Sequence, residues 1–182
     1  MEIRVAGPHD AEEIARIYAP IVEQTTISFE DCAPSAAEIA RRIETILPEY
    51  PWLVAVDDGG VAGYAYASRH RERAAYRWAA DVSCYVAERA RRRSIGKALY
   101  GALFELLSKQ HYLRLYAGIT LPNPASEALH RSVGFEPVGT YRSVGYKHGA
   151  WHDVRWYGLA LGLRDVPLEP IPFARLYEVA QR

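Results

Sequence analysis

The sequence predicts a single mixed α/β (α+β) domain, because its length, its composition and its pattern of elements all favour this class. With 182 residues, the chain is long enough for one domain with a substantial core and short for two full-sized ones. Hydrophobic residues make up 49% and charged residues 24%, as in folded soluble proteins. Helical and strand patterns alternate without an internal repeat, which favours one mixed domain.

The strands are predicted by short apolar runs that are bounded by turn residues. These runs cover residues 3–5, 52–56, 61–68, 76–86 and 113–119, followed by two strands that flank the 145–149 turn and end near residue 161. The turn sequence Asp57-Asp58-Gly59-Gly60 separates the second run from the third, and this spacing predicts a β-hairpin.

The helices are predicted where apolar residues recur at helical spacing. Capping-box sequences open the first two helices, at Asp10 with Glu13 and at Ser35 with Glu38. A long amphipathic helix is predicted over residues 94–110, and a short one ends at residues 134–135. Prolines recur after Leu163, so we expect a domain over residues 1–162 and an extended C-terminal tail over residues 163–182.

The charge and the cysteines exclude several classes of function. Lys plus Arg and Asp plus Glu both number 22, so no chain-wide field recruits nucleic acid or an anionic membrane. No apolar run has membrane-spanning length, and the first residues do not resemble a signal peptide. Cys32 and Cys84 lie far apart in no metal or redox spacing, so we expect reduced thiols in a cytoplasmic protein.

A basic segment that opens directly into the long helix carries the strongest chemical signal. The first turn of a helix has unpaired N–H groups and a partial positive charge, so it binds phosphate well. Ser94 and Gly96 are small enough for a phosphate to approach the backbone, and residues 91–93 with Lys97 add positive charge. The alternatives are a solvated basic face or a nucleic-acid patch, but the small residues at the helix start favour a phosphate site.

Four separated segments resemble one known superfamily. The sequence Arg91-x-x-Ser94-x-Gly96 resembles the pyrophosphate loop of the GNAT N-acetyltransferases, and residues 123–135 resemble the helix that lies along the pantetheine arm of the coenzyme. Residues 50–55 and 145–154 resemble phosphinothricin (methionine sulfoximine) acetyltransferases in particular. The resemblance extends from about residue 3 to residue 161.

The resemblance implies a fold, a co-substrate and a set of residues that bind it. The fold would be a mixed, mostly antiparallel central sheet that is splayed between two middle strands and flanked by helices on both faces. Acetyl-CoA would lie in that opening as co-substrate, without a metal, and the protein would be a homodimer. The coenzyme-binding residues would be Cys84, Tyr85, Val86, Arg91, Arg92, Arg93, Ser94, Ile95, Gly96, Lys97, Asn123, Ser126 and His130.

Ser94 departs from the superfamily, which usually has glycine at this position. If the loop requires a positive φ there, serine adds a strain of about 1 kcal/mol. If Ser94 instead caps the helix, its hydroxyl can accept from a backbone N–H or bind a phosphate oxygen. We favour the capping role.

Two residues are candidates for catalysis. Asp81 stands where the subfamily usually has a glutamate on the central strand, so it is the candidate base that deprotonates the amine, directly or through a water. It could also be a strand-end carboxylate that pairs with an arginine. His130 stands where many members have a tyrosine that protonates the departing thiolate, so it is either a general acid or only a coenzyme contact.

Substrate recognition is expected from the loop that precedes the central strand. By resemblance, Arg71, Arg73 and Tyr76 correspond to the substrate loop of the subfamily, and Phe29 to an aromatic residue that walls the pocket. A guanidinium binds two oxygens of a carboxylate or phosphinate at once. An exposed loop is the alternative, and for Arg69 we adopt it.

A metal site at His148, His152 and Asp153 is not expected. Their spacing falls across a glycine turn rather than on one helical face, and no third soft ligand is nearby. The segment reads instead as a late hairpin, and the resemblance places it near a dimer interface that borders the substrate pocket.

The leading hypothesis is an acetyl-CoA-dependent N-acetyltransferase that acetylates a small glutamate-like amino acid, such as phosphinothricin or methionine sulfoximine, by direct transfer. One alternative keeps the enzyme but changes the acceptor to a protein or peptide amine or another metabolite. A second alternative is a non-catalytic acyl-CoA-binding module. Nucleic-acid binding through residues 89–97 is disfavoured by the zero net charge and by the lack of a recognition motif.

Overall fold

A computed structural model, which describes residues 1–162 and 164–180, contains one seven-stranded sheet in the order β1-β2-β3-β4-β5-β7-β6. The strands are β1 Glu2–Val5, β2 Trp52–Asp57, β3 Gly60–Arg69, β4 Ala79–Val86, β5 Arg114–Thr120, β6 Glu136–Lys147 and β7 Ala150–Ala160. Neighbouring strands are antiparallel except for β4 and β5, which are parallel. The mixed, mostly antiparallel and open sheet confirms the expected fold class.

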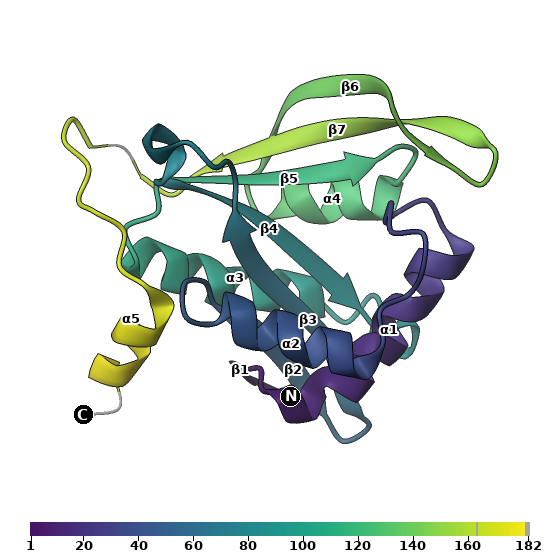
Figure 1. The fold of residues 1–182 in the computed structure, drawn as a ribbon, viewed down its shortest axis with the longest axis horizontal. Coiled ribbons are helices and arrows are strands. Elements are labelled where there is room, and N and C mark those ends of the chain that lie inside the picture. Colours follow the sequence, from purple (N-terminus) through teal and green to yellow (C-terminus); the bar gives the residue numbers. More distant parts are fainter. Residues whose placement is uncertain (163, 181–182) are drawn as a thin grey trace.

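Helices cover both faces of this sheet (Figure 1). Helices α1 and α2 lie on one face, and α3 and α4 lie on the other. The bounds are α1 Ala11–Gln24, α2 Ala36–Ile46, α3 Ile95–Lys109 and α4 Pro124–Ser132, and α5 follows at Phe173–Ala180.

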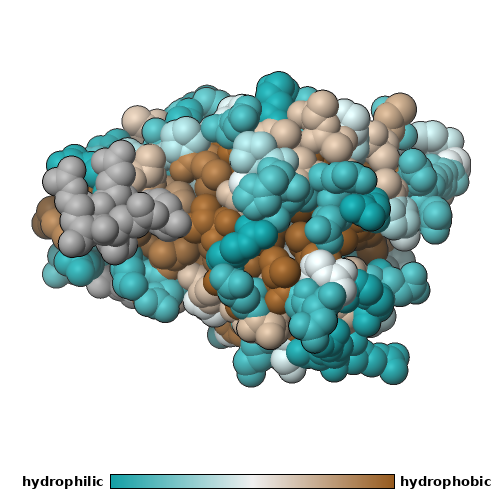
Figure 2. All heavy atoms as spheres, turned by 90° about the horizontal axis from the view of Figure 1, so that it is seen from below, coloured by the Kyte–Doolittle hydropathy of each residue, from teal (hydrophilic) through white to brown (hydrophobic). Residues whose placement is uncertain are grey.

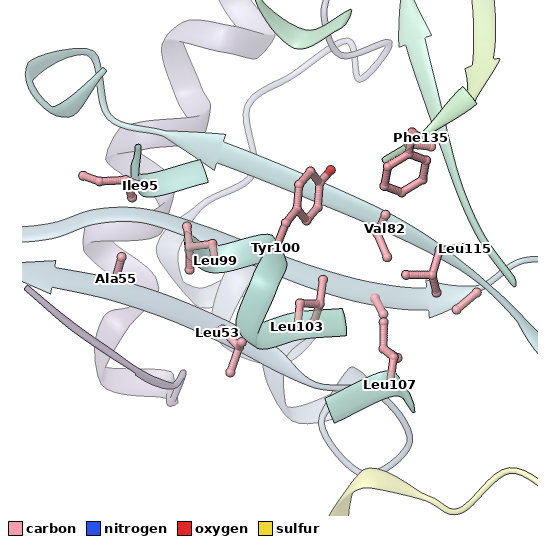
Figure 3. Packing of buried hydrophobic residues seen from close by; sticks show 14 of the residues in the cluster. Leu53, Ala55, Val82, Ile95, Leu99, Tyr100, Leu103, Leu107, Leu115 and Phe135 are labelled. Atoms are coloured by element: carbon pink, nitrogen blue, oxygen red, sulfur yellow. The ribbon is translucent and has the colours of Figure 1, made fainter. Parts of the chain in front are cut away.

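The largest core cluster fixes α3 against the middle of the sheet. Leu99, Leu103 and Leu107, one helical turn apart, are fully buried, and Figure 3 shows them packed over the central strands. Burial of one such leucine side chain contributes about 1.5–3 kcal/mol. This packing fixes the position of the N-terminus of α3, where the phosphate site was predicted.

One of the two predicted capping boxes is correct in part and the other is wrong. Ser35 Oγ accepts from the backbone N–H of Glu38 at 3.2 Å, as predicted. Asp10 instead binds the Arg4 guanidinium at 2.7 and 2.8 Å, and a 3-10 turn ends there before α1 begins. Glu13 accepts from the backbone N–H of Val61 at 2.7 Å. The prediction failed because the Asp10 carboxylate is engaged by Arg4 and by the Gly7 N–H, and the Glu13 carboxylate by a donor that is distant in the sequence.

The structure also corrects two element boundaries. The strand predicted over residues 76–86 begins only at Ala79, because residues 74–76 form a 3-10 turn. The tail was expected to be extended over residues 163–182, but α5 occupies Phe173–Ala180. Residues 163 and 181–182 lie outside the described residues. Buried Phe173 and a hydrogen bond from the Gln110 side chain to Ile171 O at 2.7 Å hold this segment on the domain.

The surface mixes polar and apolar residues. Figure 2 shows hydrophilic residues over most of one face, with hydrophobic residues exposed between them. In the part of the chain that the structure describes, no helix has the length and apolar character needed to cross a membrane.

Candidate active site

The two central strands diverge and leave a pocket between them. Strands β4 and β5 pair only from Ala79 with Arg114 to Asp81 with Tyr116. Beyond these pairs β4 continues to Val86 and β5 to Thr120, and Figure 1 shows the two strands separating toward α1. A pocket of about 730 Å³ lies at this opening, lined by both strands, by the N-terminal part of α3 and by residues along the whole of α4.

Most of the predicted coenzyme-binding residues lie around this pocket. The residues from the prediction that line it are Cys84, Tyr85, Val86, Arg91, Arg92, Ser94, Ile95, Gly96, Lys97, Asn123, Ser126 and His130. Arg93 does not line it, because its guanidinium binds Asp57 at 2.9 Å on the β2–β3 turn. Arg89 binds the same carboxylate at 2.9 Å, and hydrogen bonds from Arg89 and the Gly59 N–H hold the pKa of Asp57 below its usual range.

Ser94 does not cap α3, and this part of the prediction is wrong. It has φ 59° and ψ 13°, in the left-handed region, and its side chain makes no capping hydrogen bond. A capping hydroxyl requires extended backbone at this position, so the left-handed conformation excludes that role. The alternative that required a positive φ is correct, and serine adds about 1 kcal/mol of strain there.

The N-terminus of α3 nevertheless has the features of an anion site. The unpaired N–H groups of its first turn have no side-chain cap. Arg91, Arg92 and Lys97 form no ion pair with any described residue, so their charges remain available for an anion. A Cβ on Gly96 would lie 3.0 Å from Leu129 Cδ2, so this position brings α3 and α4 close together. These residues fit a pyrophosphate with a long arm that passes between the helices.

His130 is buried, and both of its ring nitrogens form hydrogen bonds. Nδ1 lies 2.8 Å from the Ser126 carbonyl oxygen, which can only accept, so Nδ1 carries the hydrogen. Nε2 therefore accepts from the Tyr100 hydroxyl at 2.8 Å. Burial lowers the pKa of His130, and the hydrogen bond to Ser126 opposes this only in part. His130 is thus a neutral imidazole that connects α4 to Tyr100 on α3.

The strand register places Asp81 on the sheet face that is turned away from α3. Ala80 and Val82, its neighbours on β4, pack in the α3 cluster, so Asp81 faces the opposite side. Asp81 pairs with Ser68 on β3 and with Tyr116 on β5, which puts all three on the same face. Asp81 belongs to the last pair before the strands diverge, so β4 brings it to the start of the opening, although it is not among the residues that line the pocket.

The partner of Asp81 is a histidine, not an arginine. His70 Nδ1 lies 2.6 Å from Asp81 Oδ1, and the two side chains are 12% and 27% exposed. Burial raises the pKa of Asp81, while the hydrogen bond from His70 and the charges of His70 and Arg71 oppose that rise. Sequence reasoning missed His70, although it lies inside the arginine-rich loop that was expected to bind substrate.

Two of the predicted substrate residues gather around His70. Its ring stacks on Tyr116 with centroids 4.5 Å apart and lies 6.1 Å from the Tyr76 ring. The Arg71 guanidinium lies over Trp156, 5.8 Å from the ring centroid. Arg73 is exposed at the start of the 74–76 turn, and no interaction with another described residue is recorded for its side chain.

Phe29 lies in the α1–α2 loop and packs against the β6–β7 hairpin. A Cβ on Gly145 would collide with the Phe29 ring, so only glycine allows this packing. The ring is 39% exposed and lies 6.3 Å from the His152 ring. Phe29 is not among the residues that line the pocket between the strands, so its role as a pocket wall stays a prediction.

Lys147, which sequence reasoning missed, fastens that loop to the hairpin. Its Nζ donates to the backbone carbonyls of Val22, Ser28 and Glu30 at 2.5, 2.7 and 2.9 Å. Lys147 is 8% exposed, and an ammonium has three N–H donors, so the three carbonyls satisfy it completely. The carbonyl acceptors lie on both sides of Phe29, so Lys147 positions this aromatic residue.

Of the two histidines in the hairpin, His152 is engaged within it and His148 is exposed in the turn. His152 Nε2 lies 2.9 Å from Lys147 O, and His148 has φ 51° in the turn. Asp153 binds Arg142 at 2.6 Å and the Ser143 N–H at 2.8 Å. Among the described residues, no group of three or more His, Cys, Asp or Glu side chains is arranged to hold a metal ion.

A sheet that opens beside an uncapped helix N-terminus with unpaired basic side chains is suited to a ligand that has an anionic group and a long arm. The chain belongs to the acetyltransferase (GNAT) domain family, whose model matches residues 3–156. It is therefore an enzyme of the N-acetyltransferase class, and enzymes of this family use acetyl-CoA.

Known relatives agree with this assignment. The chain is 50% identical to an N-acetyltransferase of Streptomyces griseus over 88% of this chain and 87% of that one. It is 35% identical to an L-methionine sulfoximine/L-methionine sulfone acetyltransferase of Pseudomonas aeruginosa, over 87% and 94% of the two chains. A GNAT superfamily phosphinothricin acetyltransferase of Sinorhizobium meliloti, solved in complex with AcCoA, superposes with a TM-score of 0.86 at 38% identity, covering 93% and 92%.

Proposed function

We propose that this enzyme transfers the acetyl group of acetyl-CoA directly to the amino group of a small glutamate-like amino acid, of the phosphinothricin or methionine sulfoximine type. The observation that carries the proposal is the position of Asp81 and His70 at the last β4–β5 pair, where the opening between the strands begins. Two of the relatives described above are named for acetylation of methionine sulfoximine or sulfone and of phosphinothricin, which supports the same acceptor class here.

In this proposal, residues 91–97 bind the pyrophosphate of acetyl-CoA, which supplies the acetyl thioester. The Asp81–His70 pair assists the deprotonation of the acceptor amine, because an amine is nucleophilic only after it loses a proton. Arg71 and Arg73 bind the acidic groups of the acceptor, and Tyr76 and Phe29 enclose it. Backbone N–H groups of β4 near Tyr85 and Val86 stabilise the developing oxyanion.

The state of Cys84 supports direct transfer over an acyl-enzyme. This thiol lines the pocket, and burial raises its pKa to about 12. The thiolate, not the thiol, is the nucleophile, so the raised pKa disfavours Cys84 as a carrier of the acetyl group. The acetyl group therefore passes to the amine in a complex that holds both substrates.

The hydrogen bonds of His130 favour a coenzyme contact over a general acid. Its one ring proton is donated to the Ser126 carbonyl, and Nε2 accepts from Tyr100. A neutral ring in this arrangement has no free proton for a thiolate. His130 then orients the Tyr100 hydroxyl, which lies at the pocket wall.

The experiment that tests the proposal is a thiol-release assay with acetyl-CoA and varied acceptors: methionine sulfoximine, phosphinothricin, the common amino acids and peptides. We expect turnover with the sulfoximine or phosphinothricin, intersecting double-reciprocal plots, and KM for that amine raised at least about 10-fold by Arg71→Ala or Arg73→Ala. Arg41→Ala, at an exposed position on α2, is the matched control.

Three other outcomes would contradict this proposal. Turnover only with peptides or another metabolite would favour one of the alternative acceptors. Parallel double-reciprocal plots would indicate an acyl-enzyme instead of direct transfer. Coenzyme binding without turnover on any amine would favour an acyl-CoA-binding module.

A cytoplasmic location stays a prediction from the sequence. We further propose that the protein is a homodimer whose interface includes the β6–β7 hairpin. Strand β6 is the last strand of the sheet, and large apolar side chains at least half exposed cluster on this hairpin. They are Val138, Tyr141, Val144, Tyr146 and Trp151. Sedimentation equilibrium is expected to give twice the chain mass of 20.5 kDa, and Trp151→Glu is expected to give monomers. A wild-type monomer at micromolar concentration would contradict this prediction.

A further inference from the structure

His70 and Asp81 form a hydrogen-bonded pair whose geometry fixes the proton on one ring nitrogen. The Asp81 carboxylate accepts at 2.6 Å, so Nδ1 of His70 carries the hydrogen and Nε2 has the free lone pair. A histidine in this tautomer can accept a proton at Nε2, and the carboxylate then stabilises the imidazolium that forms.

The free nitrogen is accessible. Among the described residues, His70 Nε2 has no hydrogen-bond partner. The unpaired side-chain atoms that are fully buried are Trp52 Nε1, Gln110 Oε1 and Trp156 Nε1, and His70 Nε2 is not one of them. Solvent therefore reaches Nε2 although the His70 side chain is only 12% exposed.

The ring that carries this nitrogen is held rigidly. Tyr116 stacks on its face, at a 4.5 Å centroid distance and an interplanar angle of 20°. Tyr76 and Trp156 meet it edge to face at 6.1 and 6.2 Å. These contacts come from the substrate loop, β5 and β7, so three parts of the fold fix the orientation of the ring.

We propose that His70 is the catalytic base of this enzyme, and that Asp81 is a positioning residue that acts through it. The proposal rests on the proposed function, since it concerns the proton that the acceptor amine must lose. The same pair could serve a purely structural purpose, but a packing histidine does not require an unpaired, solvent-accessible Nε2.

The reaction balances with this assignment. Nε2 takes one proton from the acceptor ammonium, and the amine nitrogen then forms a bond to the acetyl carbonyl carbon. The carbon–sulfur bond of the thioester breaks, and the coenzyme leaves as a thiolate that receives the second proton of the nitrogen. The imidazolium of His70, balanced by the Asp81 carboxylate, finally releases its proton to solvent.

The test compares wild type with His70→Gln, whose amide can still donate to Asp81 but cannot take a proton at neutral pH. With the amine that wild type acetylates, we expect kcat/KM to fall at least about 100-fold, with KM for acetyl-CoA changed less than about twofold. We also expect the acid limb of the pH profile of kcat/KM to disappear. His9→Gln, at an exposed position before α1, is the matched control.

Any pH effect must be separated from the other groups around the pair. Asp81 remains in the His70→Gln variant, so an acid limb that persists belongs to Asp81 or another group and overturns the proposal. The charged or titratable groups that face the pair are Tyr66 from β3, Asp81 from β4, Tyr116 from β5, and Arg71 and Tyr76 from the substrate loop.

A second variant protects the test against a folding defect. We expect added imidazole to raise the activity of His70→Ala at least about 10-fold over the same variant without imidazole, because imidazole can occupy the space and accept the proton. Loss of activity without rescue would indicate a structural role and overturn the proposal. Turnover retained by His70→Gln would overturn only the assignment of the base, whereas no turnover by wild type on any amine would overturn the proposed function with it.

Discussion

Asp81→Asn is expected to lower kcat by about 10²- to 10⁴-fold while leaving KM for acetyl-CoA within about twofold. The carboxylate is bound to His70 at 2.6 Å, and asparagine preserves the shape but removes the charge. The amide no longer stabilises an imidazolium, and it can hold His70 in the wrong tautomer. Steady-state kinetics with both substrates varied measures the effect.

This loss of activity should not come from instability. Burial raises the pKa of Asp81 in the folded protein, so the folded protein binds a proton at this carboxylate more tightly than the unfolded chain does. The contribution of Asp81 to stability therefore falls as pH rises from the unfolded pKa to the folded one, and at pH 7 its charge is unfavourable. At pH 7 we expect Asp81→Asn to be no less stable than wild type, to within about 1 kcal/mol in the free energy of unfolding.

Asp58→Asn, at an exposed position in the β2–β3 turn, is the matched control and should change neither quantity. A variant at Asp81 with a kcat close to that of wild type would contradict the prediction. So would a loss that arises entirely from KM for acetyl-CoA, because it would place Asp81 in coenzyme binding.

Lys147→Met is expected to lower the free energy of unfolding by about 3 kcal/mol and to raise KM for the acceptor amine. The substitution keeps most of the side-chain volume but removes three hydrogen bonds, and the Val22, Ser28 and Glu30 carbonyls are then left without this donor. The α1–α2 loop loses its attachment to the hairpin, so Phe29 no longer keeps its place.

Chemical denaturation and steady-state kinetics measure these two effects. Lys109→Met is the matched control, since that lysine forms only an exposed pair with Glu105 on α3 and should change stability by less than about 0.5 kcal/mol. An equal rise of KM for acetyl-CoA would show that the loop does not act on the acceptor side alone. Unchanged stability would contradict the role of the buried ammonium.

The coenzyme half of the site could be predicted because its signals are local in the sequence. Residues 91–97 lie at one helix terminus and residues 123–130 at another, so positions close together in the chain come to line the same pocket. The amphipathic pattern of 94–110 then places that terminus against the sheet, because the leucines of α3 must be buried. Strand and helix order followed from the same periodicity.

Three features became clear only from the tertiary structure: the backbone conformation of Ser94, the partners of Asp10, and the helix near the C-terminus. Serine is common at helix caps and tolerable at a positive φ, so the residue type alone does not distinguish these two conformations. Asp10 lost its capping role to Arg4, and α5 lies where the prolines suggested an extended chain. In each case a competing interaction outweighed a local preference.

The acceptor half of the site depends on residues that the sequence keeps apart. Asp81 was found from its strand, but its partner His70 is 11 residues away, and Lys147 reaches carbonyls between 117 and 125 residues earlier. The sequence by itself determined the fold class and the acetyltransferase family, and it predicted a phosphate site at the start of α3, because these depend on periodicity and on contiguous segments. The tertiary structure decided the tautomer of His70 and the support of Phe29, because a hydrogen bond depends on distances that strand register and loop packing alone establish.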